Sequence, residues 1–153
     1  ELINEHLVDI FAMMRFLPMN SSLADIGAGG GLPSVPLAIL RPDLRISMVE
    51  PRAKRVAFLR STVHELGLQS ATVLRCRSEE MMASSFDVCA SRATFPPNEW
   101  LEVGRTLAKH GGHVLVFTNE PWRASSPAAR LKDSILYTSG GGRPRWMGAF
   151  CFT

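Results

Sequence analysis

A cluster of glycines at positions 27 and 29–31 is the segment whose residue types could do chemistry. It follows the short run Ser22–Ile26 and precedes Leu32-Pro33. Glycines at a strand-to-helix turn let the backbone approach a ligand closely and tolerate positive φ. The N–H groups at the start of the following helix then point at that ligand. We therefore expect a ligand site here, beyond the carboxyl end of a strand.

Two acids narrow the choice of ligand. Asp25 places a carboxylate at the strand tip, two residues before the first glycine, and Glu50 ends the next expected strand. A dinucleotide site favours the spacing G-x-G-x-x-G, which needs glycine at position 32, where this chain has Leu32. The Asp25 carboxylate would repel a pyrophosphate but attract the ammonium and sulfonium groups of S-adenosylmethionine. Glu50 can accept hydrogen bonds from ribose hydroxyls in either class of cofactor. The pattern favours S-adenosylmethionine, and a nicotinamide oxidoreductase is the alternative.

The elements that must position this loop alternate between helix and strand. The alternation predicts an α/β fold with a mostly parallel sheet, helices on both faces and right-handed crossovers. We expect one domain over 1–153, with an N-terminal helix within 1–18, a Rossmann-like core over 22–153 and an antiparallel hairpin at the C-terminal edge. Helical spacing or stop signals predict helices over 2–17, 33–40, 52–66, 97–109 and 127–132; short apolar runs predict strands over 22–26, 44–49, 71–74, 86–90, 113–117, 134–138 and 146–152.

Composition sets further bounds. With 153 residues, of which 46% are hydrophobic and 20% charged, the chain fits one globular domain. No apolar run reaches the roughly 18 residues of a membrane-spanning helix, so we expect no membrane insertion. Cys76, Cys89 and Cys151 show no C-x-x-C spacing, which argues against a disulfide scaffold or a metal site and favours the cytoplasm. Arginine supplies 14 of the 17 basic residues, which suits a nucleic-acid partner or a solvated surface.

Two methylation reactions that use S-adenosylmethionine depend on recognisable residues, and this sequence matches both patterns only weakly. Methylation of cytosine carbon-5 needs a cysteine nucleophile, but the neighbours of Cys89 are typical of a buried strand, so we expect that thiol to pack in the core. Phe95-Pro96-Pro97-Asn98 contains the proline pair of an amine-methylation motif with its flanks reversed. The start of a helix is the favoured interpretation, with Phe95 free to stack on a base.

Several segments together resemble the glucose-inhibited division protein B family. These are the RsmG-type methyltransferases, which methylate guanine N7 in small-subunit (16S) ribosomal RNA. The resemblance covers about residues 4–117 in the right order. It rests on Glu5-His6-Leu7-Val8-Asp9, the run from Asp25 to Ile39, Lys54–Leu59, Arg77-Ser78-Glu79-Glu80 and Ser91-Arg92-Ala93.

The resemblance implies a class I S-adenosylmethionine-dependent methyltransferase fold and a ribosomal RNA partner. It implies that Gly27 and Leu32 contact the cofactor, Glu50 holds the ribose and Arg92 lies at the methionine end or faces the RNA. Guanine N7 carries a lone pair and no proton, so we expect no general base and name no catalytic residue. The expected cofactor-binding residues are Asp25, Gly27, Gly29, Gly31, Leu32, Glu50, Ser78, Glu79 and Arg92, and the expected substrate-binding residues are Arg52, Arg55, Arg92 and Phe95.

Departures from the family pattern lie on the expected substrate side. The family extends further upstream, and it tends to show Lys-Gly after the fifth strand, where this chain has Thr118-Asn119-Glu120. The tail from Arg143 matches the family's closing basic strand only loosely. A methyltransferase for a small molecule or another RNA, and a non-catalytic cofactor-binding or ribosome-associated module, are therefore kept as alternatives.

Overall fold

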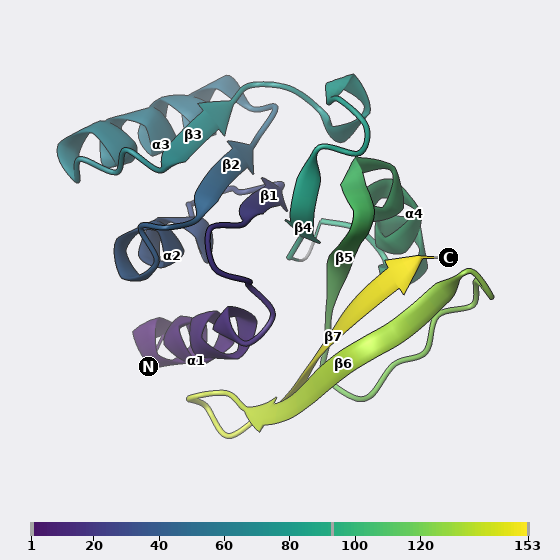
Figure 1. Ribbon diagram of the computed structural model, residues 1–153. Helices are drawn as coiled ribbons and strands as arrows, with labels where there is room; N and C mark the ends of the chain where they lie inside the picture. The colour runs from purple at the N-terminus through teal and green to yellow at the C-terminus, as the bar shows by residue number, and fades with distance from the viewer. Residues whose placement is uncertain (1, 93, 153) are drawn as a thin grey trace.

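The structure is a computed structural model that describes residues 2–92 and 94–152, with side chains from His6 onward (Figure 1). Helices and strands alternate along most of the chain, as expected. The helices are α1 (Leu2–Met14), α2 (Ser34–Leu40), α3 (Ala53–Glu65), the short 3₁₀ helix η1 (Ser78–Glu80) and α4 (Pro97–Leu107). The strands are β1 (Ser22–Ile26), β2 (Arg45–Val49), β3 (Ala71–Leu74), β4 (Phe86–Ala90), β5 (Ala108–Thr118), β6 (Ala129–Thr138) and β7 (Pro144–Phe152).

One sheet runs through the described residues in the order β3-β2-β1-β4-β5-β7-β6. The first five strands in this order pair in parallel, whereas β7 pairs antiparallel with both β5 and β6. The prediction of a mostly parallel sheet with a C-terminal antiparallel hairpin is therefore confirmed. Parallel strands end at the same edge, so the segments that follow β1, β2, β3 and β4 meet there.

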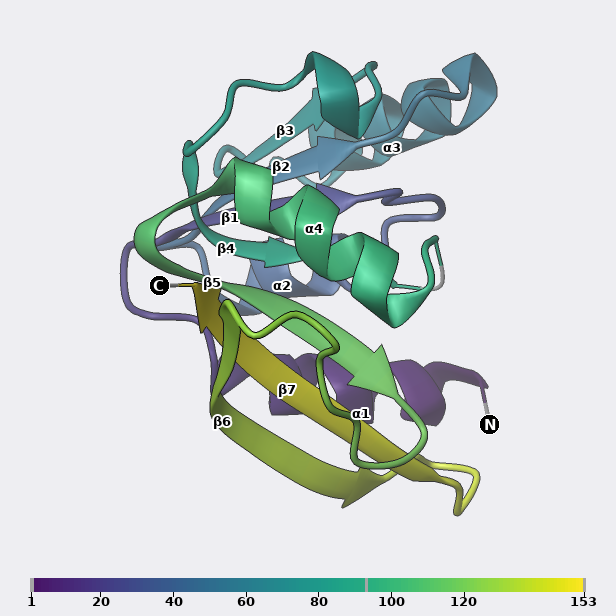
Figure 2. The ribbon, with the colours of Figure 1, turned by 90° about the vertical axis from the view of Figure 1, so that its right-hand side faces the viewer.

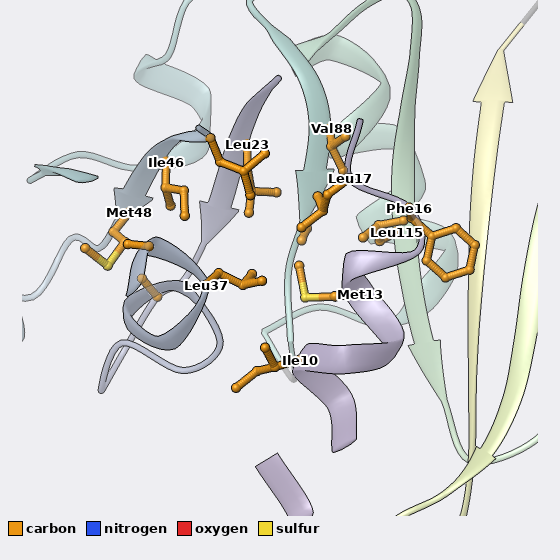
Figure 3. Packing of buried hydrophobic residues seen from close by; sticks show 14 of the residues in the cluster. Ile10, Met13, Phe16, Leu17, Leu23, Leu37, Ile46, Met48, Val88 and Leu115 are labelled. Carbon is orange, nitrogen blue, oxygen red and sulfur yellow. The ribbon is translucent and has the colours of Figure 1, made fainter. Parts of the chain in front are cut away.

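Helices cover both faces of the sheet, as the alternation predicts. On one face, Ile10 and Met13 of α1 pack with Leu37 of α2 against Leu23 and Val88 of the sheet (Figure 3). Figure 2 shows α4 across the opposite face, where Trp100 and Leu101 are buried. The two clusters follow from strand alternation, because successive side chains of a strand point to opposite faces.

The expected helix over 127–132 is wrong. Residues Ala129–Thr138 form β6, which pairs with β7 from Ala129 opposite Phe152 to Thr138 opposite Pro144. The helix propensity of the alanines and charged residues in 128–132 is weak beside a ladder of backbone hydrogen bonds to a neighbouring strand. Arg130 and Lys132 are exposed on this edge strand, where charged side chains discourage pairing with a further strand.

The boundary between α4 and β5 also differs from the sequence expectation. The helix expected over 97–109 ends at Leu107, and the strand expected from 113 already begins at Ala108. Ala108 pairs with Phe86 before the register shifts, and His113 then pairs with Val88. The extra residues of β5 include Gly111-Gly112, and the register against β4 shifts in this part of the strand.

No helix within the described ranges combines the length and the apolar character needed to cross a membrane. Among the same residues, histidine, cysteine, aspartate and glutamate side chains do not gather into a group of three or more that could hold a metal ion.

Candidate cofactor cleft

The glycine loop folds back onto the end of the neighbouring strand. The amides of Gly27 and Ala28 donate to the carbonyl oxygen of Val49 at 2.9 and 3.1 Å. Gly27, Gly29 and Gly31 have φ values of 76°, 55° and 87°, a region that residues with a Cβ rarely adopt. The loop therefore connects the tips of β1 and β2 in a conformation that needs glycine.

Two of these glycines are also required by close packing. A Cβ on Gly27 would collide with the Thr94 side chain, and one on Gly31 would lie 2.7 Å from Val35 and 3.0 Å from Leu59. Gly31 thus lets the loop pack against α2 and α3, whereas Gly27 borders the open side of the loop. Leu32 is half-buried beyond the last glycine of the loop.

Asp25 lies behind the loop rather than in front of it. Its carboxylate is 2% exposed and accepts a hydrogen bond from Ser34 Oγ at 2.6 Å. Burial raises the pKa of Asp25 to about 6, although the Ser34 hydrogen bond and the charge of Arg92 oppose the rise. A buried carboxylate with a raised pKa has a strong preference for a nearby cationic group.

Glu50 closes the loop from the side of β2. It is 2% exposed, and its two oxygens accept hydrogen bonds from the amides of Gly29 at 3.1 Å and Arg52 at 3.0 Å. Arg55 Nη1 lies 3.7 Å from the same carboxylate. An ionised carboxylate offers about four lone-pair sites, so two remain for the hydroxyls of a ligand.

A cleft of about 210 Å³ lies in front of the loop. Ser78 and Glu79 reach it from η1, a turn that the Glu80 carboxylate closes by accepting the Arg77 amide at 2.7 Å. Phe95 forms a wall of the cleft and stacks on Trp100 with their ring centroids 5.9 Å apart. The cleft is lined by Ile26, Gly27, Val49, Pro51, Cys76, Arg77, Ser78, Glu79, Thr94 and Phe95.

The donor set of this cleft fits an adenosyl group with a cationic tail. Apolar side chains and the Phe95 ring offer surfaces for a flat base. Glu50 directly follows β2, and its carboxylate oxygens could accept hydrogen bonds from hydroxyl groups. The buried carboxylate of Asp25 suits a cation and opposes a pyrophosphate. The same residues therefore fit S-adenosylmethionine better than a dinucleotide.

The structure distributes the expected site residues over four places, the last of which is a second cavity that contains Arg92. Gly27, Ser78, Glu79 and Phe95 line the cleft, whereas Asp25, Gly29, Gly31, Leu32 and Glu50 support the loop beside it. Arg52 and Arg55 are exposed at the start of α3. Ala93, the last residue of the Ser-Arg-Ala segment, lies outside the described residues.

Arg92 lies in a second cavity, of about 200 Å³, between α1 and the C-terminal hairpin. Its Nη1 donates to Asp9 Oδ2 at 3.1 Å and lies 2.9 Å from His6 Nδ1. Tyr137 donates to the other oxygen of Asp9 at 2.7 Å. This second cavity is lined by Asp9, Arg92, Phe117, Thr118, Asn119, Tyr137 and Arg145.

The sequence analysis assigned no role to several residues that line the cleft or the second cavity. Ile26, Val49 and Pro51 follow from the position of the strand ends once the strands are predicted. Tyr137 is the single tyrosine of the chain and Arg145 lies in its basic tail, but neither signal indicates a shared cavity.

Comparison with known proteins agrees with this geometry. A family model described as rRNA small subunit methyltransferase G, or GidB, matches residues 1–127. The chain belongs to this family. A ribosomal RNA small subunit methyltransferase G from a Nocardioides species is 40% identical over 113 residues, which cover 73% of this chain and 45% of that protein. The Corynebacterium diphtheriae protein of the same name is 34% identical over 149 residues, covering 94% of this chain and 65% of that protein.

Solved structures show the same fold at low sequence identity. TrmN from Thermus thermophilus superimposes with a TM-score of 0.74 at 18% identity, over 94% of this chain and 48% of that one. A SAM-dependent methyltransferase from Aquifex aeolicus gives 0.67 at 16% identity, over 90% and 86% of the two chains. The expected class I methyltransferase fold is confirmed. This member of the GidB family spans 45–65% of the length of the two relatives named above.

Proposed function

We propose that this chain is a single S-adenosylmethionine-dependent methyltransferase domain over 1–153 that methylates guanine N7 in small-subunit ribosomal RNA. The observation that carries the proposal is the cleft at the carboxyl edge of the parallel strands, bordered by the glycine loop and backed by Asp25 and Glu50. Membership of a family of ribosomal RNA small subunit methyltransferases supports the reaction and the substrate.

The cofactor-binding roles follow from the placement of the residues. The Phe95 ring and Ser78 would hold the adenine, and Glu50 would accept the ribose hydroxyls. Glu79 lies at the exposed rim of the cleft. Gly27, Gly29, Gly31 and Leu32 would shape the loop. Asp25 would attract the cationic groups of the methionine end from behind the loop, and Arg92 would lie beside that end.

The reaction makes small demands on side chains. When bound, S-adenosylmethionine would supply a methyl group on a sulfonium, which the lone pair of guanine N7 takes in an in-line displacement as the carbon–sulfur bond breaks. No proton moves, so no general base is required. Catalysis then consists largely of holding N7 in line with the methyl group, and well-oriented reactants can reach effective molarities of roughly 10⁵–10⁸ M.

Exposed arginines at the start of α3 would contact the RNA backbone. Arg52 and Arg55 lie on the side of Glu50 that faces solvent, near the cofactor cleft. Arginine pairs bidentately with phosphate, and such contacts weaken as salt displaces them. A cytoplasmic location belongs to the same proposal, and the three free cysteines support it.

Two measurements test the proposal in sequence. Calorimetric titration with S-adenosylmethionine and S-adenosylhomocysteine, with NADH as control, should show micromolar binding of the sulfur compounds alone, about −8 kcal/mol. Labelled methyl transfer to unmodified small-subunit ribosomal RNA, followed by nucleoside mass spectrometry, should then yield 7-methylguanosine. Cofactor binding without transfer to RNA or to assembled subunits would favour another acceptor or a non-catalytic module. Binding of NADH instead would overturn the cofactor assignment.

A further inference from the structure

The cavity between α1 and the C-terminal hairpin contains two arginines in different electrostatic situations. The carboxylate of Asp9, with 8% side-chain exposure, forms an ion pair with Arg92. Tyr137 completes the hydrogen bonds of that carboxylate. The positive charge of Arg92 is thus already balanced by a carboxylate of the protein.

Arg145 differs from Arg92 in this respect. Its Nη1 donates to Asn119 Oδ1 at 3.3 Å, and it forms no ion pair within the described parts of the chain. Its Nε is buried and finds no hydrogen-bond acceptor among the described residues. A buried donor without a partner is costly, so a ligand that brings an acceptor to Nε is favoured there.

The hairpin holds Arg145 at this place. Arg145 lies opposite Tyr137 in the β6–β7 ladder, and Tyr137 is in turn fixed to α1 through Asp9. Figure 1 shows the β6–β7 hairpin running beside α1. Residues 128–152 lie beyond the part of the chain that the family model matches.

The chemistry of the guanidinium selects the ligand. Its Nε and one Nη form a fork that matches two oxygens of a phosphate or carboxylate, or O6 and N7 of guanine. The proposed reaction needs N7 free to accept the methyl group, so the fork cannot occupy the reacting edge of the target base. An oxyanion remains as the group that suits this cavity.

The position of the cavity indicates where that oxyanion lies. Arg92 borders the cavity, and the preceding residue, Ser91, donates a 2.8 Å hydrogen bond to the carbonyl oxygen of Ile26, directly before the glycine loop. The cavity therefore adjoins the expected methionine end of the cofactor cleft, where the target nucleotide must enter. We propose that Arg145, with Asn119 beside it, binds a backbone phosphodiester of the RNA at or next to the methylated nucleotide. This assignment of the RNA ligand rests on the proposed function.

Three variants test the phosphate site. Arg145→Met removes the fork, and Asn119→Asp places a carboxylate next to Arg145 that would occupy the fork from within the protein. Arg143→Met removes an equal charge from an exposed residue two positions earlier and serves as the matched control. Thermal unfolding checks that each variant is folded, and Asn119 is exposed, so its substitution tests the idea even if Arg145→Met fails to fold.

The probes are unmodified small-subunit ribosomal RNA, single-stranded poly(U) and S-adenosylhomocysteine. We expect Arg145→Met and Asn119→Asp to weaken binding of both RNAs about tenfold. For Arg145→Met, the slope of log affinity against log salt should also fall by about one. S-adenosylhomocysteine affinity should not change, and Arg143→Met should have little effect on either ligand.

Each other outcome has a defined meaning. Unchanged RNA binding in both test variants would overturn the phosphate site. Loss of S-adenosylhomocysteine binding with RNA binding preserved would assign the fork to the carboxylate of the cofactor and would overturn it equally. If the wild-type chain methylates no ribosomal RNA but its poly(U) binding still depends on Arg145, the proposed reaction fails while the phosphate site stands.

Discussion

Ser34 Oγ donates a 2.6 Å hydrogen bond to Asp25 Oδ2 between two side chains that are 0% and 2% exposed. The bond joins the second-to-last residue of β1 to the first residue of α2, across the glycine loop. It thereby fixes both ends of the loop that borders the cofactor cleft. The same bond supplies the donor that a buried carboxylate requires.

Replacing Ser34 with alanine should destabilise the protein. The Asp25 carboxylate would remain buried without this donor, and an unsatisfied buried acceptor costs about 1–3 kcal/mol. Urea unfolding monitored by circular dichroism measures the change. Ser61→Ala is the matched control, because that hydroxyl donates to Glu65 on an exposed helix surface, and surface changes stay within about 0.5 kcal/mol. Equal stability of the two variants would contradict a supporting role for the Ser34–Asp25 bond.

The raised pKa of Asp25 predicts an unusual dependence of stability on pH. Its folded-state pKa is about 6 against an ordinary value of 3.8, so the native state binds this proton more tightly than the unfolded chain. The contribution of Asp25 to stability is therefore greatest below the ordinary pKa and declines as pH rises to about 6. Asp25→Asn removes this titration while keeping an acceptor for Ser34. The free energy of unfolding of the variant minus that of wild type should increase by about 2 kcal/mol between pH 4 and 6.

Asp43→Asn is the control for this experiment, because the pKa of Asp43 is lowered and its contribution to stability should therefore depend on pH in the opposite direction. The Arg41 hydrogen bond lowers the pKa of Asp43, so its contribution is present above the ordinary pKa and is lost as pH falls below it. The loss of stability of the Asp43→Asn variant relative to wild type should therefore become smaller in acid. Stability curves for Asp25→Asn and wild type that run parallel from pH 4 to 6 would show that Asp25 titrates normally.

We expect alanine substitutions in the glycine loop to lower cofactor affinity to different extents, depending on the position. Gly27→Ala places a Cβ at a φ of 76° and against Thr94, and positive φ alone costs an L-residue about 1–2 kcal/mol. We expect S-adenosylhomocysteine affinity to fall by about tenfold or more, since the loop must move off the tip of β2. Calorimetry measures the affinity. Gly30→Ala is the control, because a Cβ there meets no atom within 4 Å.

A double variant separates the two causes of the Gly27 effect. Thr94→Ala removes the colliding side chain but leaves the backbone strain, so Gly27→Ala combined with Thr94→Ala should recover part of the affinity. No recovery would assign the effect to φ alone. Affinity in Gly27→Ala equal to that of Gly30→Ala would argue that the ligand does not approach this loop.

The elements around the first cleft were predictable because their signals are local. The glycines and the strand tip before them lie within a few residues of one another, and parallel strands bring their carboxyl ends to one edge whatever the loops between them do. Ser78 and Glu79 were expected from the family resemblance and not from a local signal. The helix expected over 127–132 failed for the opposite reason. Pairing with β7, from Ala129 opposite Phe152 onward, decides its conformation.

The second cavity could not be predicted for a related reason. The hairpin register puts Tyr137 opposite Arg145, and a hydrogen bond then joins Tyr137 to Asp9, which is 128 positions away in the chain. One residue of slip in the register would turn either side chain to the other face of the sheet. Strand alternation alone therefore does not indicate that Asp9, Tyr137 and Arg145 share a cavity.

Phe95 provides the sharpest test of which ligand the first cleft holds. The sequence analysis expected its ring to stack on a base of the substrate, whereas the structure places the ring in the wall of the cleft that also contains Ser78 and Glu79. If that cleft binds the adenosyl group, Phe95→Leu should lower the affinity for S-adenosylhomocysteine by about threefold to tenfold, the worth of one aromatic stacking contact. Affinity for small-subunit ribosomal RNA should stay unchanged.

The controls for Phe95→Leu address folding and the alternative role. Phe58→Leu makes the same exchange on α3, where the ring is 55% exposed, and should alter neither affinity. Thermal unfolding shows whether loss of stacking on Trp100 has disturbed α4. Weaker RNA binding with unchanged S-adenosylhomocysteine binding would return Phe95 to the substrate side, and the adenine would then have to lie elsewhere along the edge formed by β1, β2 and β3.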